Sequence, residues 1–199
     1  MIILKVYSES PSEKQLRQIS ESLSNGGIMI WKADNRYSFA CDALNAKAIE
    51  RICSLKHLDP AKALLSIACP DISTASEYVR IDNRMFRLMK EHTPGSFTFI
   101  FKTGNSLPRV FKGRKTAGIR IPANGSALAI LNHYGKPLLT STLQDDDPDY
   151  TVNTGLIAEK YASGADMLVD CGDGALEETT VVDCRGDVPE IMRQGAGII

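Results

Sequence analysis

The chain has 199 residues, of which 43% are apolar and 24% charged, and its formal net charge at pH 7 is −1. This composition is typical of a globular protein and excludes a disordered or collagen-like chain. The length is sufficient to bury a core without disulfides, so we predict one domain over residues 1–199. A net charge this close to zero does not predict a class of binding partner.

Residues 1–10 turn polar too quickly for a secretory signal peptide, and no run approaches the roughly 20 apolar residues of a membrane span. We therefore expect a soluble, cytoplasmic protein without a membrane partner. The five cysteines are odd in number, widely spaced and lack a CxxC pair, which favours free thiols in the core over disulfides or zinc. The three histidines lie far apart, so no tightly bound metal is expected. The oligomeric state is left open.

The first predicted elements are a strand at residues 2–7 and a helix after it. Ser10 is the expected N-cap of this helix, with Pro11 at N1 and Glu13 at N3. Gly26 and Gly27 end it.

Later helices are predicted from their caps and apolar spacing. One over roughly 45 to 56 begins at Asn45, another begins after Asp82, and a third begins at Ser126 and ends at Gly135. A fourth is expected over 151–163, after a flexible loop at 144–150. Further strands are expected at 28–31, 63–69, 97–101, 118–121, 137–142, 167–171 and 179–184. Strands and helices alternate, with strand following strand once in the middle, which favours an α/β fold around a mixed sheet.

Charge is polarised along the chain. Residues 92–144 contain no Asp or Glu, whereas residues 145–199 carry 13 acidic residues against three basic ones. One interpretation is a positive surface or cavity for phosphate or nucleic acid, with an RNA-binding patch at Lys112, Arg114 and Lys115. The other is that the two blocks pair across the fold and cancel.

Residues 30–43, IWKADNRYSFACDA, place charged and amide groups inside an apolar run. The flanks are typical of a buried strand and a packed turn. The polar centre at 32–36 is tolerated where the segment leaves the core to line a cavity.

Four stretches, taken in order, resemble the YrdC/YciO family. GGIMIWKADNRYSFACDA compares with the family's Gly-Gly, apolar strand, Pro-Thr-Asp-Thr box and Tyr-Gly-Leu-x-Cys-Asp, and AIERICSLKHLDPAKALLSIACPDIS resembles its helix, lysine-rich loop and strand. TPGSFTFIFK and TAGIRIPAN resemble Pro-Gly-x-(Phe/Tyr)-Thr and Gly-x-Arg-x-Pro, and GKPLLTSTLQ resembles a Pro-(Leu/Met)-x-Ser-Thr-Ser box. The similarity spans nearly the whole chain and leans toward the YciO branch.

The resemblance implies a fold and a set of ligands. The fold is a YrdC/RibB-like, twisted, mixed parallel and antiparallel sheet with flanking helices and a large positively charged concave surface. Family members that make threonylcarbamoyl-adenylate join L-threonine, bicarbonate and ATP for a tRNA modification, and the family is also associated with double-stranded RNA. The expected ligands are therefore ATP with Mg²⁺, and tRNA or double-stranded RNA.

The resemblance also assigns nucleotide- and anion-binding residues. Lys56 and Lys62 match the two lysines of the family's Lys-x-Arg-Pro-x-x-Lys loop, but Leu58 stands where catalytic members have arginine. Leucine has no donor, whereas arginine supplies a planar fork for phosphate oxygens. Arg120 matches the arginine of Gly-x-Arg-x-Pro, and its alternative role is a salt bridge with the acidic third.

The hydroxyl box is retained in part. Thr140, Ser141 and Thr142 match the Ser-Thr-Ser box and are expected to bond an adenylate, although such clusters also occur in turns. Leu143 and Gln144 follow where synthases continue with Ala-Asn.

The Pro-Thr-Asp-Thr box is the most altered motif. Lys32, Ala33, Asp34 and Asn35 occupy its positions, so only the aspartate is retained and two hydroxyls are lost. We expect Lys32, Asp34 and Asn35 to line a substrate pocket whose occupant differs from threonine. Lys32 is expected either to hold an anion there or to face solvent.

Three functions compete. The first is a protein that binds RNA or a nucleotide in a basic cavity without the family's chemistry. The second is a threonylcarbamoyl-adenylate synthase with altered motifs. The third is an enzyme acting on another small anionic substrate, and no catalytic residue is assigned.

Overall fold

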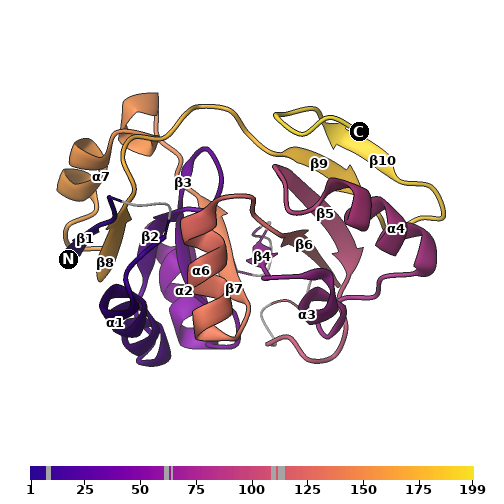
Figure 1. Cartoon of the computed structure of the whole chain (residues 1–199), viewed down its shortest axis with the longest axis horizontal. Coiled ribbons are helices and arrows are strands. Elements are labelled where there is room, and N and C mark those ends of the chain that lie inside the picture. Colours follow the sequence, from indigo (N-terminus) through magenta and orange to yellow (C-terminus); the bar gives the residue numbers. More distant parts are fainter. Residues whose placement is uncertain (8–9, 61–62, 64, 109–110, 112–114) are drawn as a thin grey trace.

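The fold is taken from a computed structural model that describes residues 1–7, 10–60, 63, 65–108, 111 and 115–199. The ten named strands form one sheet in the order β1-β8-β2-β3-β7-β4-β6-β5-β9-β10 (Figure 1). They are β1 (Ile2–Lys5), β2 (Met29–Lys32), β3 (Tyr37–Asp42), β4 (Ser66–Ala68), β5 (Phe97–Lys102), β6 (Thr116–Arg120), β7 (Leu138–Thr142), β8 (Met167–Asp170), β9 (Thr180–Asp183) and β10 (Glu190–Arg193). The sheet contains parallel pairs such as β1–β8 and β4–β6 and antiparallel pairs such as β3–β7 and β5–β6. The predicted mixed α/β sheet is therefore confirmed.

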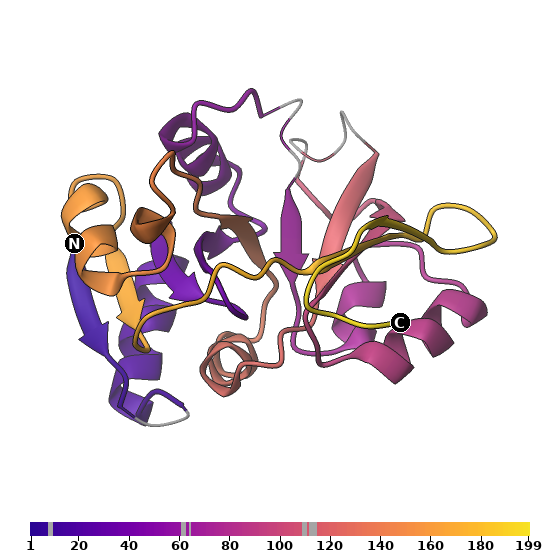
Figure 2. The ribbon, with the colours of Figure 1, turned by 90° about the horizontal axis from the view of Figure 1, so that it is seen from above.

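The helices cover both faces of this sheet. They are α1 (Glu13–Ser24), α2 (Ala46–Leu55), α3 (Ile72–Ser76), α4 (Asn83–His92), α6 (Gly125–Tyr134) and α7 (Thr154–Lys160), with a 3₁₀ turn η1 at Pro148–Thr151. Figure 2 shows α1 and α6 apart from the α3 and α4 pair, with the chain between β8 and β9 running across the molecule. β2 is buried on both sides, because Met29 and Trp31 pack with α1 and α6 while Ile28 and Ile30 join the other core cluster.

Side-chain caps fix where the helices begin. Asn45 accepts from the Ala48 N–H, as expected for the helix predicted there. Asp82 accepts from the N–H groups of Arg84 and Met85 and caps α4. Gly135 ends α6 in the left-handed conformation with φ of 70°.

Two predicted helix starts are wrong by two residues. α1 is capped by Ser12, whose partner in the capping box is Gln15, so Ser10 is not the N-cap. α6 is capped by Asn124, whose side chain accepts from the Ala127 N–H, so the helix begins before Ser126. In each case two polar residues lie two positions apart, and the cap is the one whose side chain accepts from an N–H of the first turn.

The sequence did not distinguish two of the strands. β3, YSFACD, is buried along its whole length and shows no alternation, so its residues resemble a packed turn. β10 is exposed along its whole length and carries no apolar pattern either. The loop predicted at 144–150 contains the start of η1, capped by Asp147, and the helix predicted over 151–163 is the shorter α7.

The cysteines are free, and Cys41, Cys53, Cys69 and Cys184 are buried as small core side chains. Burial raises the pKa of the Cys69 and Cys184 thiols to about 12, which keeps them protonated. None of the helices in the described ranges has the length and hydropathy to cross a bilayer.

Candidate functional site

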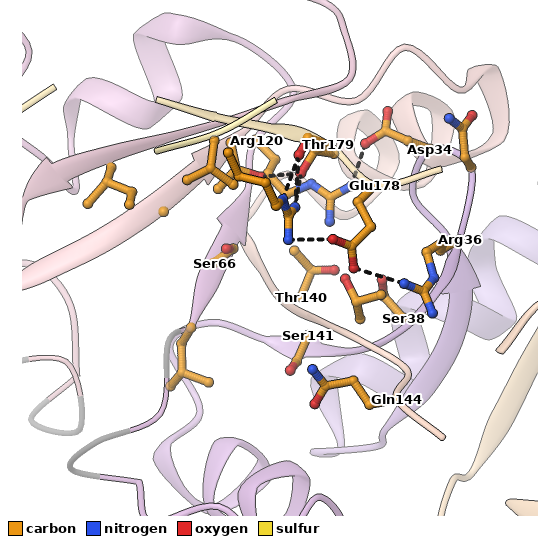
Figure 3. A pocket seen from close by; sticks show the side chains of 18 of the residues that line it. Asp34, Arg36, Ser38, Ser66, Arg120, Thr140, Ser141, Gln144, Glu178 and Thr179 are labelled. Atoms are coloured by element: carbon orange, nitrogen blue, oxygen red, sulfur yellow. Dashed lines mark hydrogen bonds and ion pairs between the residues drawn. The ribbon is translucent and has the colours of Figure 1, made fainter. Parts of the chain in front are cut away.

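A cavity of about 270 Å³ lies on the central strands of the sheet and is partly open to solvent (Figure 3). Its walls come from segments far apart in the sequence, chiefly the β2–β3 loop, the end of α2, the strands β4 to β7, and β9 with β10. The polar lining residues are Asp34, Asn35, Arg36, Ser38, Lys56, Ser66, Thr98, Thr116, Arg120, Thr140, Ser141, Thr142, Gln144, Glu177, Glu178, Thr179 and Arg193. Of the predicted site residues, Asp34, Asn35, Lys56, Arg120 and the three hydroxyls at 140–142 thus meet in one place.

Hydroxyl groups form the floor of the cavity because neighbouring strands bring them into register. Ser38 of β3 lies opposite Thr142 of β7, and Ser66 of β4 lies between Thr140 and Gly118. A Cβ at position 118 would lie 2.6 Å from the Ser66 hydroxyl oxygen, so only glycine leaves this floor open. Such hydroxyls can donate to and accept from a bound ligand.

Lys56 reaches the cavity from the C-cap of α2. Its Nζ donates to the Ser141 hydroxyl at 2.8 Å and to the Thr142 carbonyl oxygen at 2.7 Å. Desolvation lowers the pKa of this ammonium to about 8. No carboxylate is paired with Lys56 among the described residues, so its charge is available to an anion in the cavity.

Arg120 and Asp34 form a buried ion pair at the cavity wall. Nη2 of Arg120 donates to the Asp34 carboxylate at 2.5 Å, and the side chains are only 8% and 4% exposed. The same carboxylate accepts from the Ala123 N–H at 3.2 Å, next to the start of α6. Both Asp34 oxygens are therefore engaged within the protein.

A second set of charges was not predicted. The Glu178 carboxylate bridges two arginines, accepting from Arg36 Nη1 at 2.9 Å and pairing with Arg193 Nη1 at 2.6 Å. Figure 3 shows Glu178 directed toward Arg36 within the cavity. The three residues come from the β2–β3 loop, the segment before β9, and β10. In the sequence, the excess of acidic residues after position 145 was the signal that carboxylates there would pair with basic side chains elsewhere.

Lys32 lies outside the cavity lining, which corrects the prediction that it lines a substrate pocket. Its ammonium donates to the carbonyl oxygens of Cys171, Gly172 and Asp173 at 3.1 to 3.3 Å. Asn35 lines the cavity, and its amide donates to Glu177 at 3.2 Å. The polar residues at 32–36 are thus partly explained by contacts with the segment at 171–178, which they hold against the sheet.

The basic block at 92–144 is dispersed in the fold. Arg120 pairs with Asp34 and Lys136 with Asp42, so these cations pair with the first third of the chain rather than with the acidic last third. Lys102 and Lys115 line a separate depression together with Arg80. Lys62, Lys112 and Arg114 lie outside the described residues.

The cavity lining is close to electrically balanced. Four cations (Arg36, Lys56, Arg120 and Arg193) face three carboxylates (Asp34, Glu177 and Glu178) among the described lining residues. The expected large positive concave surface therefore stays a prediction, and Lys56 is the cavity cation without a carboxylate partner in that lining.

The sheet and this pocket define an α/β protein with a partly enclosed polar cavity of small-molecule size. A family model described as Telomere recombination, which covers Sua5, YciO and YrdC proteins, matches residues 21–195. The chain belongs to the Sua5/YciO/YrdC family, as its motifs predicted.

The YciO protein of Escherichia coli is similar to this chain over nearly the whole length of both. The uncharacterized protein YciO of Escherichia coli (strain K12) is 32% identical over 195 residues, which cover 96% of this chain and 94% of that protein. The crystal structure of E. coli YciO matches with a TM-score of 0.91 at 31% identity, covering 100% of this chain and 98% of that one.

One further relative is named as a synthase, and one further solved structure is a complex with L-threonine. The threonylcarbamoyl-AMP synthase of Bacillus subtilis (strain 168) is 26% identical over 94% of this chain and 55% of its own length. The crystal structure of P. abyssi Sua5 complexed with L-threonine has a TM-score of 0.85 at 22% identity, covering 98% of this chain and 58% of that one. The second likeness shows the fold alone.

Proposed function

We propose that this protein binds a nucleotide in its cavity, with the phosphate groups placed against Lys56 and the hydroxyls of β7. The observation that carries the proposal is the position of Lys56, an ammonium without a carboxylate partner in the described lining, held by Ser141 and Thr142. In a partly desolvated site such a charge attracts an anion more strongly than it would in bulk water.

The size and chemistry of the cavity support a small ligand. Its volume of about 270 Å³ is just below the range of about 300–1,000 Å³ that is usual for small-molecule sites. An RNA helix does not fit such a space, so RNA would bind elsewhere on the surface. The name of the B. subtilis relative denotes a synthase whose product is an adenylate, which supports an adenine nucleotide as the ligand here.

Mg²⁺ would enter with the triphosphate rather than occupy a site of its own. The described residues include no group of three His, Cys, Asp or Glu side chains that could hold a metal ion. The Lys56 ammonium and the hydroxyls would contact phosphate oxygens that the ion leaves free. The free cysteines support our expectation that the protein works in the reducing cytoplasm.

Titration calorimetry with ATP tests the proposal. The pH dependence of the measured affinity tests whether Lys56 contacts the phosphate groups. Only protonated Lys56 attracts phosphate, and its pKa in the free protein is about 8. Affinity should hold below pH 8 and fall above it by up to about tenfold per pH unit. In a Lys56→Arg variant the side chain stays charged above pH 8, so the affinity for ATP should not change with pH there. Absence of ATP binding at pH 7 would refute the proposal.

Synthase activity is a separate question that one assay decides. The chain carries Ala33 and Leu58 where the resemblance places a hydroxyl and an arginine in catalytic members. We expect ATP binding without pyrophosphate release when threonine and bicarbonate are added. Pyrophosphate release above an ATP-only control would instead assign the synthase reaction.

RNA is a second candidate ligand, favoured by the depression that Arg80, Lys102 and Lys115 line. The three side chains are exposed, and none of them pairs with a carboxylate of the described residues. Lys102 follows Thr98 and Ile100 on one face of β5, so this depression adjoins the face that carries the cavity. A polyanion that lies along this face would contact the positive charges of these three side chains.

We expect tRNA and duplex RNA to bind here with a steep salt dependence, because phosphate contacts release counterions. Replacing Arg80, Lys102 and Lys115 together with glutamine should weaken all sequences alike and reduce the log–log salt slope by roughly two to three. The matched control replaces the exposed Lys14, Lys47 and Lys90. Equal losses in both triple variants, or salt-insensitive binding, would contradict this site.

A further inference from the structure

We propose that Arg36 and Arg193 form an anion subsite of the cavity, which the protein's own Glu178 occupies in the free state. A phosphoryl group of the ligand binds there by replacing the Glu178 carboxylate. The inference rests on the proposed nucleotide binding and specifies what admits the phosphate. Its basis is the bridge in which one carboxylate joins both guanidinium groups, at 2.9 Å and 2.6 Å.

The two arginines are held in place independently of Glu178. Arg36 also donates from Nη2 to the Thr151 hydroxyl at 3.1 Å. Arg193 also donates from Nη2 to the Thr179 carbonyl oxygen at 2.8 Å. Both guanidinium groups would therefore stay nearly in position if the carboxylate left, and a site formed in advance costs little ordering on binding.

Glu178 is anchored through its backbone, and the two arginines are the contacts that hold its side chain in the cavity. Its carbonyl oxygen accepts from the Ala196 N–H at 2.9 Å, and nearby the Ala175 N–H donates to the Asn35 carbonyl oxygen at 2.8 Å. The side chain is 42% exposed, so rotation about its own bonds can carry the carboxylate into solvent. Because the carboxylate is already half-exposed, water can replace part of what it loses when it leaves the two arginines.

Charge and geometry select a phosphoryl group as the replacement. Two guanidinium groups face one carboxylate, which leaves one positive charge uncompensated at the subsite. A phosphate dianion supplies the second negative charge, and its oxygens suit two planar forks. The hydroxyls of Ser38 and Thr140 line the same cavity and can donate to further oxygens.

Titration calorimetry with pyrophosphate and ATP tests the replacement, using Glu178→Gln and, as the matched control, Glu190→Gln. Glu190 is an exposed carboxylate of β10 outside the cavity lining, so both variants change the net charge equally. We expect Glu178→Gln to bind pyrophosphate at least tenfold more tightly than the natural protein, and Glu190→Gln to match the natural protein. Adding Arg193→Met to Glu178→Gln should remove the gain. Thermal melts confirm that each variant is folded.

The outcomes separate this inference from nucleotide binding itself. If the natural protein binds ATP and Glu178→Gln binds no more tightly, the self-occupied subsite is wrong and the proposed function stands. Equal gains in Glu178→Gln and Glu190→Gln would also overturn it, because net charge alone would then explain them. If the natural protein and Glu178→Gln both bind neither probe, the subsite and the proposed function fail together. AMP as a third probe distinguishes recognition of the phosphate chain from recognition of the nucleoside.

Discussion

An Asp34→Asn variant is expected to lose about 3–5 kcal/mol of folding free energy, because it leaves the Arg120 guanidinium buried without its counter-charge. The pair is more than nine-tenths buried on both sides and lies at the cavity wall. Asparagine keeps an oxygen that can accept from the Ala123 N–H, so the loss should come from the missing charge and not from the start of α6. Urea denaturation at pH 7 measures the effect.

A double variant, Asp34→Asn with Arg120→Met, controls for this interpretation. Removing both charges leaves no isolated ion, so the double variant should be more stable than Asp34→Asn alone. The single variant Arg120→Met completes the comparison. If the losses of folding free energy in Asp34→Asn and Arg120→Met add up to the loss in the double variant, the two charges do not interact and the pair does not hold the cavity wall as described.

A Lys56→Met variant is expected to bind ATP roughly 10- to 100-fold more weakly, since a hydrogen bond to a charged group contributes about 1.5–3 kcal/mol. Methionine keeps the apolar stem, so the cap of α2 and the fold should persist. The measurement is calorimetry at pH 7, below the pKa of about 8, where lysine is charged in the natural protein.

Lys47→Met is the matched control, because Lys47 is an exposed lysine of the same helix. It should leave ATP affinity unchanged. If Lys56→Met binds ATP as the natural protein does, the ligand does not contact this ammonium, and the proposed orientation of the phosphates is wrong.

Much of the fold follows from local sequence chemistry. Asn45, Asp82 and Gly135 marked helix ends because cap residues act through the backbone next to them. β3 was missed because a strand buried on both faces has no period-two pattern. The position of β8 between β1 and β2 was also beyond local chemistry, since it depends on pairing across more than 130 residues.

The candidate site was predictable only where the family motifs survive. Asp34, Lys56, Arg120 and the hydroxyls at 140–142 meet as the resemblance implied. The altered Pro-Thr-Asp-Thr box misplaced Lys32, because its ammonium bonds three carbonyl oxygens at residues 171–173 instead of lining the cavity. The motifs also did not predict the bridge through Glu178, because long-range ion pairs leave no spacing in the sequence.

The contacts between residues 32–37 and 171–178 have a consequence for biosynthesis. Tyr37 and Lys32 both bond the Gly172 carbonyl oxygen, which the ribosome adds 135 residues after Tyr37. A nascent polypeptide that stops after β8 still lacks Thr179 and Arg193, and with them one side of the pocket. The pocket is therefore complete only after the ribosome has added Arg193, and a polypeptide that stops before Thr179 would lack this side of the site that we propose for the ligand.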